Sequence, residues 1–92
     1  MGATIGPRLM ALSGEDLTRA SGSLRAYSVA GNDDDRDEAH SILTDLILDA
    51  TAQGDQEAFE ALNEARLLLS QGQSQANDAD NMLEALAQTR RE

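Results

Sequence analysis

The residues with the clearest chemical potential are a run of carboxylates, Asp33-Asp34-Asp35-Arg36-Asp37-Glu38. Carboxylate oxygens are the ligands that calcium prefers, but a calcium loop of the EF-hand type needs glycine at its sixth position and glutamate at its twelfth. Counted from Asp33, these positions hold Glu38 and Thr44. We therefore interpret the run as the first turn of a helix, where the dipole and free N–H groups favour negative charge. No metal site is predicted.

His40 is the only histidine of the chain, with Asp37 and Asp45 near it in the sequence. An imidazole flanked by carboxylates can act as a general base. The chain has no cysteine, no second histidine and no serine in a recognisable nucleophile motif to work with it. We expect His40 to be exposed, and we predict a protein that is not an enzyme and binds no cofactor.

Carboxylates also recur at helical spacing along three later stretches of the chain. Residues three, four or seven apart share one face of a helix, with about 5–6 Å between successive turns, so each stretch presents a row of negative charge. Eleven carboxylates lie between Asp33 and Glu64 with a single arginine, Arg36, so the usual cationic partners are missing. The partner-binding surface predicted from these rows comprises Glu38, Asp45, Asp49, Glu57, Glu60, Glu64, Asp80 and Glu84.

The net charge of −10 over 92 residues limits the classes of partner. A surface of this sign repels nucleic acid and anionic membranes and attracts proteins with a basic surface. We therefore predict no direct nucleic-acid partner and no membrane partner. The lack of a signal peptide, of an apolar stretch near 20 residues and of cysteine predicts a cytoplasmic protein. The use of arginine without lysine is typical of GC-rich coding in a bacterium or a phage.

The elements that position these residues are predicted to be helices. One Phe, one Tyr and no Trp argue against a sheet, since strands draw on aromatic and β-branched residues. Cap residues and 3.6-residue periodicity predict helices from Ser13 to Gly31, from beyond Asn32 to Gly54, from Asp55 to Gly72, and from Ser74 onward. Ser13, Asp55 and Ser74 are the expected N-caps, and Arg90 and Arg91 are expected to favour the negative end of the last helix.

The fold class that follows is all-α, a small antiparallel helical bundle of three long helices plus a looser N-terminal helix, which Gly22 weakens. We expect residues 1–12 to be a flexible N-terminal segment and residues 13–92 to form the single domain. Several apolar residues lie beside the main stripes and either widen the core or form a seam for a second molecule. They are Leu9, Met10, Leu12, Leu48, Leu67 and Leu68.

These features predict a non-enzymatic regulator, an inhibitor or a chaperone, that masks a basic partner protein through its acidic helices. Two alternatives remain. The carboxylate rows could imitate a nucleic-acid strand, whose charges are about 3.4 Å apart, and block a DNA- or RNA-binding protein such as a bacterial defence effector. The additional apolar residues could instead make the chain an assembly subunit that self-associates, at its simplest as a homodimer.

Overall fold

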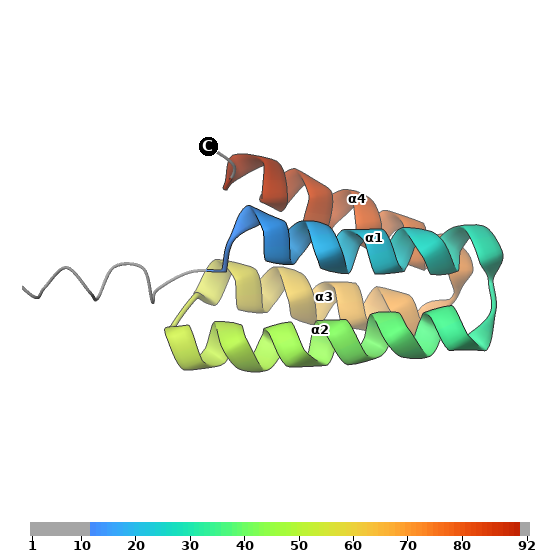
Figure 1. The fold of residues 1–92 in the computed structure, drawn as a ribbon, viewed down its shortest axis with the longest axis horizontal. Coiled ribbons are helices and arrows are strands. Elements are labelled where there is room, and N and C mark those ends of the chain that lie inside the picture. The colour runs from blue at the N-terminus through green and yellow to red at the C-terminus, as the bar shows by residue number, and fades with distance from the viewer. Residues whose placement is uncertain (1–11, 91–92) are drawn as a thin grey trace, which may run out of the picture.

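A computed structural model of the chain describes residues 12–90, which form four helices packed as an antiparallel bundle (Figure 1). The helices are α1 (Gly14–Ala30), α2 (Asp33–Gln53), α3 (Gln56–Gln71) and α4 (Gln73–Thr89). The all-α bundle predicted from the sequence is confirmed. With 17 residues, α1 is as long as α4. The predictions for Leu9, Met10, Arg91 and the rest of residues 1–11 lie outside the described residues.

The helices surround one core in the order α1, α2, α3, α4, so each packs against two neighbours. The contact between α1 and α4, the first and last helices, is the most extensive. The start of α1, the α2–α3 turn and the end of α4 lie together at one end of the bundle (Figure 1). Among the described helices, none is long and apolar enough to cross a membrane.

The helix boundaries follow from local side chain to backbone hydrogen bonds. The Ser13 hydroxyl accepts the Asp16 N–H at 3.1 Å at the start of α1, and a carboxylate oxygen of Asp55 accepts the Ala58 N–H at 3.2 Å at the start of α3. Both predicted N-caps are confirmed. α1 ends at Gly31, whose φ of 69° is one that glycine adopts without steric cost.

The predicted start of α4 at Ser74 is wrong. α3 ends at Gln71 and α4 begins at Gln73, so Gly72 alone joins the two helices, with φ 143° and ψ −178°. Only glycine reaches this conformation readily, so the reversal takes place in one residue and leaves Ser74 inside the helix. α4 consequently has no side-chain cap.

The core consists of eight leucines, eight alanines and Ile47. The alanines let the helix backbones approach closely, and the leucines fill the space between them. Among the residues expected inside, Tyr27, Ile42, Phe59, Met82 and Leu86 are only half-buried. Leu12 is fully part of the core at 3 % exposure, whereas Leu48 and Leu67 remain 64 % and 51 % exposed.

Candidate protein-binding surface

Two residues of the predicted acidic surface, Asp80 and Glu84, pair with Arg25 of α1, and Asp80 is buried. Asp80 is 3 % exposed, and Arg25 of α1 donates from Nε to its Oδ2 at 3.1 Å. The Ser21 hydroxyl also donates to Asp80, and Arg25 Nη2 reaches Glu84 at 2.7 Å. Asp80 is therefore not on a solvent-facing row, because it fixes α4 against α1. These pairs raise the pKa of Arg25, the hydrogen bond to Asp80 contributing most.

A second cluster ties both ends of the described chain to the α2–α3 turn. Asp55 accepts two hydrogen bonds from Arg90, Nη1 to Oδ2 at 2.6 Å and Nη2 to Oδ1 at 3.0 Å. It also accepts the Leu12 N–H at 3.0 Å, while Arg90 donates to the Leu12 carbonyl at 3.1 Å. The side chains of Asp55 and Arg90 are 6 % and 15 % exposed. Water is thus largely excluded from this ion pair.

The Arg90 guanidinium is the main reason that the pKa of Asp55 is lowered from 3.8 to about 2. Burial opposes this shift, and the N–H groups of Leu12 and Ala58 add to it. Arg90 also reaches Glu57 at 3.1 Å, so the pKa of the guanidinium is raised, chiefly by the hydrogen bond to Asp55. The sequence predicted an interaction of Arg90 with the dipole of α4, and the structure adds this pairing with a distant turn.

The α2 row remains a surface of uncompensated negative charge. Glu38, Asp45 and Asp49 are all exposed, and within residues 12–90 none of them forms an ion pair. Glu38 lines a shallow hollow together with Ser23 and Ala26 of α1. Because residues seven and eleven positions further along share its side of the helix, the row follows the edge of α2 that borders α1.

The carboxylates of the α3 row form more contacts within the chain than those of the α2 row. Glu57 is paired with Arg90, the residue that follows α4, and Glu60 accepts a hydrogen bond from Gln56 at 2.9 Å. Glu64 is exposed, and within the part of the chain that the structure describes it has no ion pair. The ion pair with Arg90 places Glu57, and with it Glu64 seven residues further on, on the side of α3 that borders α4, whereas Glu60 points away from the bundle. The two rows therefore lie on opposite sides of the α2–α3 pair and do not merge into one acidic face.

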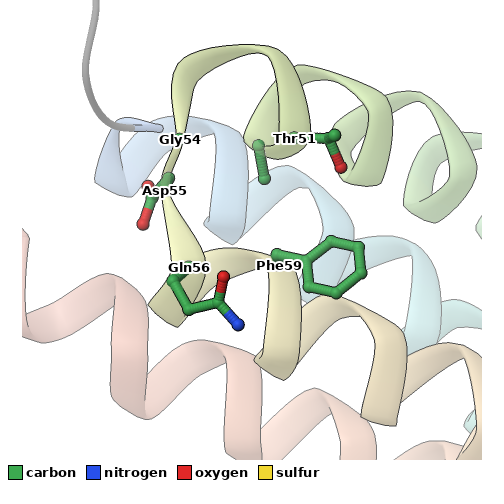
Figure 2. A pocket seen from close by; sticks show the side chains of 6 residues that line it. Thr51, Gly54, Asp55, Gln56 and Phe59 are labelled. Atoms are coloured by element: carbon green, nitrogen blue, oxygen red, sulfur yellow. The ribbon is translucent and has the colours of Figure 1, made fainter.

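The outer face of α2 and α3 lies between the two rows and carries exposed apolar side chains. Thr51 and Phe59 line an open hollow of about 230 Å³ next to the α2–α3 turn (Figure 2). Leu48 lies three residues before Thr51, and Leu67 lies three residues before Ser70. Because Thr51 and Ser70 both line hollows between α2 and α3, the two exposed leucines project from this side of the bundle. This face carries the largest exposed apolar side chains of α2 and α3.

His40 is exposed, as predicted, and lines a hollow of about 340 Å³ with Arg36, Asp37, Leu69 and Ser70. The Ser70 hydroxyl donates to the Leu67 carbonyl at 2.8 Å, which is a bond within its own helix. Within residues 12–90, no three side chains of His, Asp or Glu converge in a way that would hold a metal ion.

Comparison with known proteins found no match. No protein-family model, no curated protein and no solved structure matches this chain.

Proposed function

We propose that this protein is a non-catalytic binding protein, an inhibitor or a chaperone, that masks a basic surface of a partner protein. The observation that carries the proposal is the α2 row of Glu38, Asp45 and Asp49, which is exposed and has no arginine paired to it within residues 12–90. The repulsion within such a row lowers stability by a few tenths of a kcal/mol per pair. Cations of a bound partner relieve this repulsion.

The bundle supplies a rigid support for the row. α2 is fixed through buried Ala39, Leu43, Leu46 and Ala50, so the exposed carboxylates are held at fixed spacing before a partner arrives. A preformed array of charge loses little conformational entropy on binding, and charge of one sign accelerates association with a basic partner.

The test compares three forms of the tagged protein as bait in nuclease-treated cell lysate, with mass spectrometry of the bound proteins. The row variant is E38Q/D45N/D49N. The control E15Q/D37N/D78N changes the net charge equally at exposed carboxylates outside the row, of which Asp37 lies on the side of α2 that faces α3. We expect the wild type and the control to retain the same basic protein, and the row variant to lose it. Rising salt should release that protein, since exposed ion pairs are screened. Equal retention by all three forms would contradict the proposal.

The nucleic-acid mimic remains the alternative form of this function. It differs in one measurable respect, because the partner of a mimic binds DNA or RNA through the surface that this protein covers. Added duplex DNA or RNA should then displace the retained partner at constant ionic strength. Lack of competition favours a regulator that masks a surface of another kind.

A further inference from the structure

On the side of α3 that borders α2, the partly and fully exposed residues are arranged so that two antiparallel copies of the helix match apolar with apolar residues and positive with negative charge. These residues recur at intervals of three and four residues and therefore form one stripe along the helix. They are Gln56, Phe59, Glu60, Asn63, Arg66, Leu67 and Ser70. Phe59 and Ser70 both line hollows shared with α2, at Thr51 and at His40 respectively, which places the stripe on the outer α2–α3 face.

We propose that this face binds a second copy of the chain, with α3 antiparallel to α3 of the other copy and a two-fold axis at Asn63. An antiparallel pairing centred there sets Leu67 of each copy against Phe59 of the other, and Arg66 against Glu60. The polar ends, Gln56 and Ser70, also meet. A two-fold interface requires reciprocal contacts of this kind. If Leu67 of one copy contacts Phe59 of the other, then Phe59 of the first copy contacts Leu67 of the second.

The structure supplies apolar surface that such a contact would bury. Leu67 is 51 % exposed, and the open hollow beside Phe59 has a volume of about 230 Å³, which exceeds that of an isobutyl side chain. Figure 2 shows the residues that line it. Leu48, 64 % exposed on α2, lies three residues before Thr51, which lines this hollow, and so shares its side of the helix. Pairing places Leu67 of one copy into the hollow of the other and covers Leu48 at the same time.

Charge selects a second copy over a basic partner for this face. The chain carries a net charge of −10, so two copies repel unless they meet where negative charge is sparse. On the α3 stripe the one carboxylate, Glu60, lies opposite the one arginine, Arg66, of the second copy. Within residues 12–90, Arg66 donates only to Asn63 of its own helix, at 3.0 Å, and turning the guanidinium toward that carboxylate gives up this one bond.

The proposed dimer and the masking function use different surfaces, so each can hold without the other. The α2 row borders α1, and Glu57 and Glu64 border α4, so a dimer formed through the α2–α3 face leaves these carboxylates outside. Glu60 is the one residue of the predicted acidic surface that the dimer would use.

Sedimentation velocity of the full chain, from low micromolar to several hundred micromolar, tests the proposal. We expect a reversible monomer–dimer equilibrium with a dissociation constant in the micromolar range, as for an interface near 1,000 Å². R66E should weaken dimerisation roughly tenfold or more, since the symmetry replaces two attractive pairs with two repulsive ones. E60R should act in the same direction.

The diagnostic variant is the double exchange E60R/R66E. It restores opposite charges across the two-fold axis within a single type of chain, so we expect dimerisation close to that of the wild type. L67D should abolish the dimer, and V29D is its matched control, since Val29 is 79 % exposed on α1 beside α4. Circular dichroism of each variant confirms that the bundle is folded.

A chain that stays monomeric at every concentration would overturn the proposal. So would a dimer that tolerates both R66E and L67D, because the copies would then meet through another face. If the chain is monomeric and L67D instead removes a protein retained from lysate, the face serves a foreign partner and the proposal is likewise wrong.

Discussion

Asp55 is expected to contribute a measurable and pH-dependent part of the stability of the bundle. Its carboxylate caps α3, accepts the Leu12 N–H and pairs with Arg90, which joins the α2–α3 turn to both ends of the described chain. Folding lowers the pKa of Asp55 from 3.8 to about 2. At 1.36 kcal/mol per pKa unit, the ionised carboxylate favours the folded state by about 2 kcal/mol.

The sign of the pH dependence follows from the lowered pKa. The contribution is complete above the unfolded pKa of 3.8 and is lost as the pH falls toward the folded pKa of about 2. D55N removes the charge at every pH. We therefore expect it to lower the free energy of unfolding by about 2–3 kcal/mol at neutral pH, because it loses the ion pair and one acceptor. Near pH 2 most of this difference should disappear.

Urea unfolding of the wild type and D55N, followed by circular dichroism across a pH series, measures this difference directly. Asp49, which is exposed on α2, provides the control, since D49N should change the free energy of unfolding by less than about 0.5 kcal/mol. A loss from D55N that is the same at neutral pH and near pH 2 would refute the role of the Arg90 pair. It would assign the stabilisation to the uncharged capping bond alone.

Further predictions concern the glycines and the second buried carboxylate. Gly72 has φ 143°, so G72A should lower the unfolding free energy by about 1–3 kcal/mol, whereas G22A, inside α1 and facing open space, should raise it by about 0.5–1 kcal/mol. Thermal unfolding of both tests the assignment, and a stabilising G72A would contradict it. D80A should lower stability by about 1–3 kcal/mol, because Ser21 loses a buried partner, and unchanged stability would show that Asp80 does not hold α4 against α1.

Local signals account for the parts of the fold that the sequence predicted well. The N-caps Ser13 and Asp55 act within three residues of themselves, and Gly31 ends α1 by its own conformation. Such interactions need no knowledge of the remaining chain. The start of α4 was misplaced because Ser74 is a good N-cap by type, whereas the chain reverses at Gly72.

The contacts between residues far apart in the chain were harder to predict from the sequence. Arg90 and Asp55 are 35 positions apart, and nothing in their local sequence indicates that they meet. Asp80 did carry a signal, since it follows Ala76 by four residues and precedes Leu83 by three, within the buried stripe of α4. A carboxylate in such a stripe requires a cation from a neighbouring helix, and Arg25 provides it.

The separation of the acidic rows also depended on the packing. Periodicity places carboxylates on one side of α2 and on one side of α3, but it does not say which neighbour each side borders. The hollow that Glu38 shares with α1 and the ion pair of Glu57 with Arg90, at the end of α4, supply that information. The surface between the rows, which carries Leu48 and Leu67, could be identified only from the packing of the helices.

The measurement that tests the masking function most directly is the affinity of the retained partner for the wild type and for E38Q/D45N/D49N, by calorimetry over a salt series. We predict binding to the row variant roughly ten- to a hundredfold weaker, as for three exposed ion pairs, and a smaller dependence on salt. The control E15Q/D37N/D78N should bind like the wild type. Equal affinities of the wild type and the row variant at every salt concentration would contradict the account.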